Sequence, residues 1–291
     1  MTSLVSWVGV DSRGPASIYI ATDSRISWGS GSTWDAGRKV FAGRSRPEVF
    51  GYVGDVLFPS LILGQIADAI ETPFEIEEPP AEQRFERVTD LLKSAFQSLP
   101  SSQRRAFQIV YARRFGEGMK ADFRFFSLSW DESTRWKSEE KDPPPRSDSI
   151  VIWGSGASSV ALWKDRWNNS SQGRTSRAIF SSFCDAVGSA QDPLSGGAPQ
   201  LVGLYRIGPS RTIGVVHAGK PFVFGLQADP ADHVRSGLEW RNRLFERCDA
   251  SGNRVASAQP HHSPRGLGRS ATAVDAAQQQ HADGRPLRGR R

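Results

Sequence analysis

The sequence predicts an α+β fold in which two mainly antiparallel β-sheets pack face to face between helical layers, a four-layer αββα sandwich. Apolar runs follow one another in the order strands, two helices, strands, two helices, strands. The strands come as hairpins rather than in alternation with single helices, which favours antiparallel pairing. With 291 residues, 38% of them hydrophobic, the chain is long enough for one large or two small domains with a buried core.

The opening stretch, residues 2–39, is the part around which the other elements are expected to pack. Two β-rich runs, residues 2–10 and 17–25, flank a turn that contains Gly14 and Pro15. This pattern is typical of a β-hairpin.

Two helices are expected after this hairpin. Residues 56–70 are apolar on most faces and predict a buried helix, whereas residues 81–99 carry apolar side chains at helical spacing and predict an amphipathic one. A third helix is expected at residues 157–167, and Thr175 is a candidate N-cap for a fourth. Strands are expected at residues 106–113, 123–130, 134–138, 149–153, 200–207, 212–217 and 221–224.

The end of the chain is expected to differ from the main domain, residues 1–230. Residues 231–249 follow Pro230 and carry spaced apolar side chains, which predicts a C-terminal helix. Residues 250–291 are rich in Ser, Ala, Gln, Gly, Pro and Arg and have almost no large apolar side chains, which predicts a disordered tail.

The net charge of +6 comes mostly from this tail, which contains seven arginines and two aspartates. The remaining body is close to neutral, which is not the pattern of a dedicated nucleic-acid binder. Nucleic acid is therefore an unlikely partner.

Composition also bounds the cellular context. No apolar run approaches the roughly 18 residues of a membrane span, and the first residues lack the basic and apolar regions of a signal peptide. We therefore expect no membrane partner and a cytoplasmic location. Cys184 and Cys248 are the two cysteines, and neither has metal-ligand spacing around it. They are expected to be free thiols in a reducing compartment, and no metal or cofactor is expected.

Thr2 is a candidate nucleophile. A small second residue normally permits removal of Met1, which would leave a hydroxyl and a free α-amine on one residue. An α-amine with a pKa of about 7.7–8.0 is well matched to act as the general base for that hydroxyl. Lys39 would favour the neutral amine by charge repulsion, and Asp23 would hold the lysine in place. A backbone N–H at Gly54, just before the helix expected from residue 56, is a candidate oxyanion donor.

These residues lie in motifs that resemble those of proteasome β-type subunits, members of the N-terminal nucleophile (Ntn) hydrolases, including the bacterial proteasome-like ones. The resemblance depends on the order and approximate spacing of the motifs, from Thr2 to Gly197. It departs from the family pattern in the long turn at residues 11–15 and in Asp55, where a small neutral residue is usual. The matching motifs are Thr2, Ala21-Thr-Asp23-Ser-Arg25, Lys39 with two apolar residues after it, Gly51-Tyr-Val-Gly54, Trp153-Gly-Ser155-Gly156 and Asp192-Pro-Leu-Ser195-Gly-Gly197.

The resemblance implies an Ntn hydrolase fold and a threonine-type peptidase that forms an acyl-enzyme on Thr2. It implies that Asp23 and Lys39 are the charged pair beside the nucleophile and that the Gly54 N–H binds the oxyanion. Three residues are implied to orient the amine and its attendant water: Ser155, Asp192 and Ser195. The family also implies a homo-oligomer that takes peptides or unfolded proteins. No Gly-x-x-x-x-Gly-Lys motif occurs, so an ATP-dependent unfoldase would be a separate chain.

Two alternatives remain open at this point. An Ntn amidohydrolase could use the same nucleophile on a small molecule, and an inert relative could serve as a ring-forming scaffold. The complete set of residues speaks against an inert protein. Ser155 lies between two glycines but lacks the full Gly-x-Ser-x-Gly pattern of a hydrolase nucleophile elbow, and none of the histidines is assigned a catalytic role.

Overall fold

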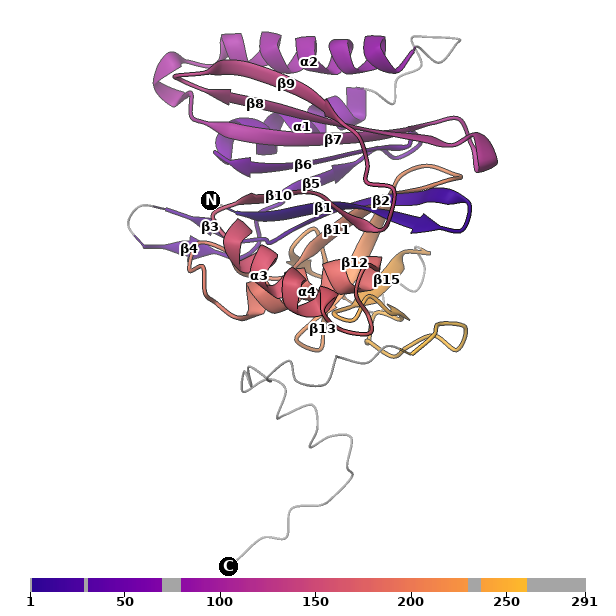
Figure 1. Ribbon diagram of the computed structural model, residues 1–291. Helices are drawn as coiled ribbons and strands as arrows, with labels where there is room; N and C mark the ends of the chain where they lie inside the picture. The colour runs from indigo at the N-terminus through magenta and orange to yellow at the C-terminus, as the bar shows by residue number, and fades with distance from the viewer. Residues whose placement is uncertain (1, 29–30, 70–79, 230–236, 261–291) are drawn as a thin grey trace, which may run out of the picture.

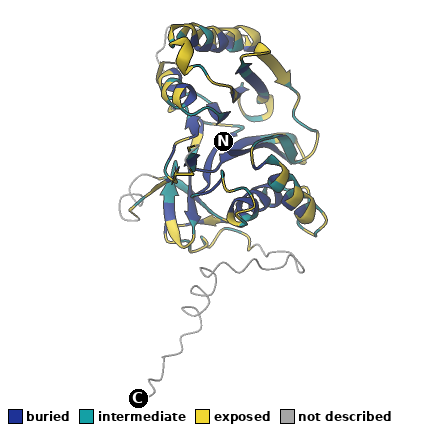
Figure 2. Ribbon diagram, turned by 90° about the vertical axis from the view of Figure 1, so that its left-hand side faces the viewer, coloured by how far each residue is buried: buried dark blue, intermediate teal, exposed yellow. Residues whose placement is uncertain are grey.

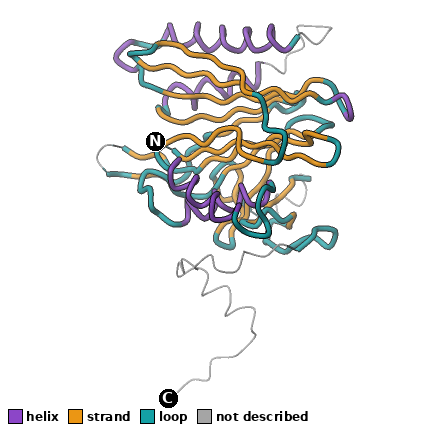
Figure 3. Tube along the Cα trace, in the orientation of Figure 1, coloured by secondary structure: helices purple, strands orange, loops and turns teal. Residues whose placement is uncertain are grey.

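The computed structural model describes residues 2–28, 31–69, 80–229 and 237–260. Its strands form two stacked sheets, and helices cover the outer face of each (Figure 1). The tube in Figure 3 shows the same order, with helices outside and strands between them. The predicted four-layer αββα sandwich is confirmed.

The first sheet contains the opening hairpin, formed by β1 (Ser3–Asp11) and β2 (Gly14–Thr22). The hairpin pairs antiparallel as predicted, with a register shift between Gly9 and Val10. The strand order is β10-β1-β2-β11-β12-β13-β14. The other strands are β10 (Asp148–Gly154), β11 (Gln200–Tyr205), β12 (Arg211–His217), β13 (Lys220–Val223) and β14 (Leu226–Gln227).

The second sheet has the order β5-β6-β7-β8-β9, and every neighbouring pair is antiparallel. A separate two-stranded hairpin, β3 (Ile26–Ser27) with β4 (Thr33–Trp34), comes between β2 of the first sheet and β5 of the second in chain order. The strands of the second sheet are β5 (Val40–Ala42), β6 (Glu48–Gly54), β7 (Phe107–Phe115), β8 (Asp122–Asp131) and β9 (Arg135–Lys141).

The helices occur where the sequence predicts them. They are α1 (Leu57–Ala69), α2 (Ala81–Ser98), α3 (Ala157–Asn168) and α4 (Ser176–Gly188), with short 3-10 turns at Ser101–Gln103 and Gly118–Lys120. Thr175 caps α4 as predicted, because its Oγ1 accepts a hydrogen bond from the N–H of Ala178 at 3.1 Å. The prediction of a buried helix is met on one face of α1, where Phe58, Leu63 and Ile66 are buried, but Leu57 and Leu61 are 42% and 60% exposed.

Strand alternation separates the core into layers. In β1, Leu4 and Val8 belong to the apolar cluster between the two sheets, whereas Val5 and Trp7 belong to the cluster beneath α3 and α4. A third cluster joins α1 and α2 to the outer face of the second sheet. The central strands are accordingly buried on both faces, and exposed residues gather on the outer helices (Figure 2).

The predicted C-terminal helix at residues 231–249 is wrong over its described part. Residues 237–249 contain two strands, β15 (Glu239–Asn242) and β16 (Arg247–Cys248). β15 pairs parallel with β12, the one parallel pairing among the described strands. Gly214 of β12 explains the pairing in part: a Cβ there would lie 2.3 Å from Trp240, so the missing side chain makes room for the indole. Residues 231–236 lie outside the described part.

The expectation of a disordered tail from residue 250 is not met at residues 250–260, which the structure describes. Ala250 is buried, and Arg254 forms an isolated bridge with Cys248. The main domain therefore extends past residue 230 to include these contacts, while residues 261–291 lie outside the described part. Cys184 and Cys248 are both buried and unpaired. None of the described helices is long and apolar enough to cross a membrane.

Candidate active site

A buried ion pair lies where the two sheets meet. Lys39 Nζ donates to Asp23 Oδ1 at 2.9 Å, and both side chains are completely buried. Lys39 Nζ also donates to the carbonyl oxygen of Arg25. Asp23 directly follows β2 of the first sheet, and Lys39 directly precedes β5 of the second. The pair therefore links the two sheets at one point.

The Asp23 carboxylate is surrounded by backbone donors as well. Its Oδ1 accepts from the N–H of Ser3 at 3.0 Å, and its Oδ2 accepts from the N–H groups of Gly196 at 2.9 Å and Arg25 at 3.1 Å. Charge-assisted bonds of this kind are stronger than neutral ones. They hold the carboxylate in one orientation relative to the first strand.

Burial dominates the electrostatics of this pair. Burial lowers the pKa of Lys39 below its ordinary value, and the Asp23 charge opposes this shift. Burial raises the pKa of Asp23, while Lys39 and the N–H groups of Gly196 and Ser3 favour its charged form. Because four donors face the carboxylate, we assign the pair as ionised, with an ammonium that is easier to deprotonate than an exposed lysine.

Gln200 hydrogen-bonds to the backbone of both members of the pair, a role that the sequence analysis missed. Its Oε1 accepts from the N–H of Lys39 at 3.0 Å, and its Nε2 donates to the carbonyl oxygens of Asp23 at 3.1 Å and Gly37 at 2.7 Å. The residue begins β11 and is 1% exposed. Its position just after the Ser195-Gly-Gly turn gave no signal of these distant partners.

Thr2 is completely buried, and its Oγ1 has no hydrogen-bond partner among the described residues. It immediately precedes Ser3, whose N–H is bound to Asp23. Gly154 faces it from β10: φ there is +96°, and a Cβ would lie 1.7 Å from the Thr2 carbonyl oxygen. Only glycine suits that position, because both the backbone angle and the space exclude a side chain.

A second hydrogen-bonded cluster brings together three of the predicted residues. Asp192 Oδ2 accepts from Ser155 Oγ and from Ser195 Oγ, each at 2.7 Å. Ser195 Oγ is in turn 2.8 Å from Ser3 Oγ. The cluster therefore reaches the residue next to Thr2.

Gly54 ends β6 with φ of +95°, and a Cβ there would lie 2.6 Å from the carbonyl oxygen of Ala106. Its strand runs beside the lysine, since the N–H of Tyr52 donates to the carbonyl oxygen of Lys39 at 3.3 Å. Asp55, the departure from the family pattern, accepts from the N–H of Phe58 at 3.4 Å in the first turn of α1. The role of Gly54 as an oxyanion donor stays a prediction.

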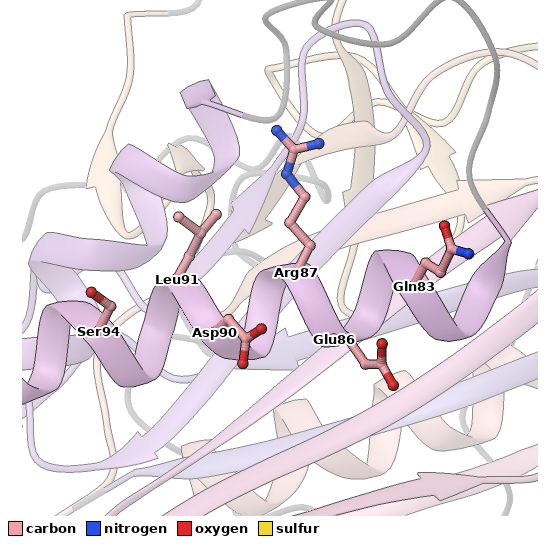
Figure 4. A pocket seen from close by; sticks show the side chains of 6 residues that line it. All are labelled: Gln83, Glu86, Arg87, Asp90, Leu91 and Ser94. Atoms are coloured by element: carbon pink, nitrogen blue, oxygen red, sulfur yellow. The ribbon is translucent and has the colours of Figure 1, made fainter.

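Other features of the described residues do not compete with this site. The described residues contain no group of three or more His, Cys, Asp or Glu side chains that could hold a metal ion. A surface hollow on the outer helical layer is lined by α2 alone, with Arg87, Asp90 and Leu91 along it (Figure 4). It includes none of the candidate residues.

No family model matches the chain, and no curated protein matches it in sequence. Among solved structures, it is similar to BPH from Thiobacillus denitrificans in complex with epoxomicin, at 17% identity and a TM-score of 0.44, over 70% of this chain and 99% of that one. It is also similar to HslV from Trypanosoma brucei, at 12% identity and a TM-score of 0.43, over 69% and 99% of the two chains. Anbu, an ancestral β-subunit from Yersinia bercovieri, has 9% identity and a TM-score of 0.47, over 69% and 81%. Values this low carry no argument about activity, which must come from the site.

Proposed function

We propose that the protein is a threonine-type peptidase of the Ntn hydrolase class, with Thr2 as its nucleophile and its own α-amine as general base. The observation that carries this proposal is the shared acceptor Asp23 Oδ1, which binds both Lys39 Nζ and the N–H of Ser3. It ties a buried ammonium to the residue that follows Thr2.

The first half of the reaction forms an ester on Thr2. The α-amine takes the hydroxyl proton, Oγ1 bonds to the carbonyl carbon of the scissile peptide, and the proton passes to the leaving amine as the C–N bond breaks. The Lys39 ammonium favours the neutral amine and stabilises negative charge developing on Oγ1. The N–H of Gly54 is the proposed donor to the oxyanion.

The second half hydrolyses the ester. Water replaces the departed amine and loses a proton to the α-amine. Its oxygen bonds to the acyl carbon, and the proton returns to Oγ1 as the ester bond breaks. Ser155, Asp192 and Ser195 are the proposed groups that orient the amine and this water. Their mutual hydrogen bonds support a fixed arrangement.

The proposed substrates are peptides and unfolded proteins, and the proposed form is a homo-oligomer in which assembly limits access to Thr2. A separate ATP-dependent unfoldase is a proposed partner. The resemblance of the motifs from Thr2 to Gly197 to those of proteasome β-type subunits is the basis for proposing the oligomer.

Covalent labelling tests the proposal directly. An epoxyketone reacts with a hydroxyl and a free α-amine on the same residue, so it should label the protein at Thr2 after loss of Met1. Intact mass and peptide mapping detect both the label at Thr2 and the loss of Met1. Native mass spectrometry gives the number of subunits in the oligomer. Cleavage of fluorogenic peptides and casein, compared with small acylated amines, separates a peptidase from a small-molecule amidohydrolase. Label at Ser155 or Ser195, or an active protein that retains Met1, would overturn the mechanism.

A further inference from the structure

We propose that Ser3 is a positioning residue for the nucleophile, and that it acts through Ser195 to join the two hydrogen-bonded clusters of the site. This inference rests on the proposed function. Ser3 is 2% exposed and lies between Thr2 and the rest of β1.

The backbone of Ser3 belongs to the first cluster. Its N–H donates to Asp23 Oδ1 at 3.0 Å, and its carbonyl oxygen accepts from the N–H of Asp23 at 3.2 Å. The first bond fixes the peptide plane that joins Thr2 to Ser3, and the second fixes the next plane, between Ser3 and Leu4.

The side chain of Ser3 belongs to the second cluster, and the direction of its bond can be assigned. Ser195 Oγ has a single hydrogen, which it donates to Asp192 Oδ2 at 2.7 Å. In the 2.8 Å contact between the two serines, Ser3 Oγ must therefore be the donor. The result is a directed chain from Ser3 through Ser195 to the Asp192 carboxylate, and such chains strengthen as each bond polarises the next.

Gly156 gives independent support for the place of this hydroxyl. Its φ of −88° is ordinary for any residue, so backbone conformation does not require glycine. A Cβ there, however, would lie 2.0 Å from Ser3 Oγ and 3.2 Å from both Asp192 Oδ2 and Ser195 Oγ. The space that a side chain would fill is taken by the Ser3 hydroxyl and its partners.

Ser3 is thus anchored at both ends, and loss of its hydroxyl should free one side of the Thr2–Ser3 peptide. Because the misplaced group is the nucleophile rather than a substrate contact, the effect should fall on kcat and on the labelling rate of Thr2, and KM should stay nearly constant.

The test compares peptide hydrolysis and β-lactone labelling in Ser3→Ala, Ser3→Thr, Ser195→Ala and the Ser3→Ala/Ser195→Ala double variant. Ser3→Ala should lower kcat up to about tenfold, the size of one net hydrogen bond, and Ser3→Thr should restore much of it. The double variant should match Ser195→Ala within about twofold, because both changes break the same chain. Ser6→Ala is the matched control: it removes another buried β1 hydroxyl, bonded to the carbonyl oxygen of Tyr19, and should keep wild-type kinetics.

Wild-type kcat in Ser3→Ala, or losses that multiply in the double variant, would overturn the inference. If Ser3→Ala does not fold, Gly156→Ala decides, since its Cβ displaces the hydroxyl while Ser3 remains; a wild-type rate there would also overturn it. Failure of the proposed function would give a different experimental result from failure of the Ser3 inference alone. The wild-type protein would then take no label at Thr2, and the inference would fail with it, whereas label at Thr2 with unchanged Ser3→Ala kinetics would defeat the inference alone.

Discussion

Lys39 Nζ lies 2.9 Å from Asp23 Oδ1 with neither side chain exposed to solvent. A buried pair of this kind is poor at adding stability but costly to break, because removing one partner leaves the other charge uncompensated. Its presence at the junction of the two sheets fits a role in chemistry better than one in stability.

Lys39→Ala should therefore abolish most peptidase activity and also destabilise the fold. Loss of the ammonium leaves the Asp23 carboxylate buried, at a cost of about 3–5 kcal/mol. Lys39→Arg should not rescue activity, because the larger planar guanidinium does not fit a completely buried site. Peptide hydrolysis and urea unfolding measure the two effects. Lys137→Ala, at an exposed β9 position, is the control, and wild-type turnover in Lys39→Ala would remove the lysine from the mechanism.

Thr2→Ala should lower turnover by several orders of magnitude without loss of structure, because no other group can form the ester. Thr2→Ser keeps a hydroxyl and an α-amine and should retain partial activity; it lacks the γ-methyl that restricts the Oγ rotamer. Hydrolysis rates and epoxyketone labelling measure both variants, with exposed Thr33→Ala as control. Turnover by Thr2→Ala at the wild-type rate would show that another residue is the nucleophile.

Two truncations should distinguish the contribution of residues 251–260 to stability from that of residues 261–291. Removing residues 261–291 should leave the unfolding temperature unchanged, because their composition offers little apolar surface to offset the entropy of ordering. Removing residues 251–291 should lower it. That cut deletes the bonds from the N–H of Val255 to the carbonyl oxygen of Arg247 at 3.0 Å and from the N–H of Asp249 to that of Asn253 at 2.9 Å.

Each such bond contributes on the order of 1 kcal/mol, and each kcal/mol shifts the unfolding temperature by roughly 2–4 °C in a domain of this size. Thermal unfolding followed by circular dichroism measures both cuts. Equal unfolding temperatures for the two truncated proteins would show that residues 251–260 add nothing to the fold.

His217 should make stability fall in mild acid. Burial lowers its pKa below the ordinary value, so below about pH 6.5 the unfolded chain binds a proton that the folded chain resists. The free energy of unfolding therefore decreases as pH falls from about 6.5 toward the folded pKa, and is constant above that window for this group. Urea unfolding at pH 7.5 and 5.5 tests this. His217→Gln should reduce the difference in the free energy of unfolding between pH 7.5 and 5.5. An unchanged difference in this variant would show that other groups cause the pH dependence.

The sequence by itself determined the order and type of most elements, because these depend on local patterns. The β-rich runs beside the turn at Gly14 and Pro15, the helical spacing of α2 and the Thr175 cap of α4 can each be recognised within about a dozen neighbouring residues. The motif order also identified Asp23 with Lys39, and Ser155 with Asp192 and Ser195, as sets that the fold then brings together.

Only the tertiary structure determines the features that depend on contacts between residues far apart in the sequence. Residues 239–248 carry a spacing compatible with a helix, yet they form β15 and β16, because pairing with β12 and the space above Gly214 outweigh local preference. The bonds of Gln200 to Lys39 and of Ser3 to Ser195 join residues 161 and 192 positions apart. No local pattern encodes such contacts, since they exist only when the chain has folded and a buried polar group must find its partner.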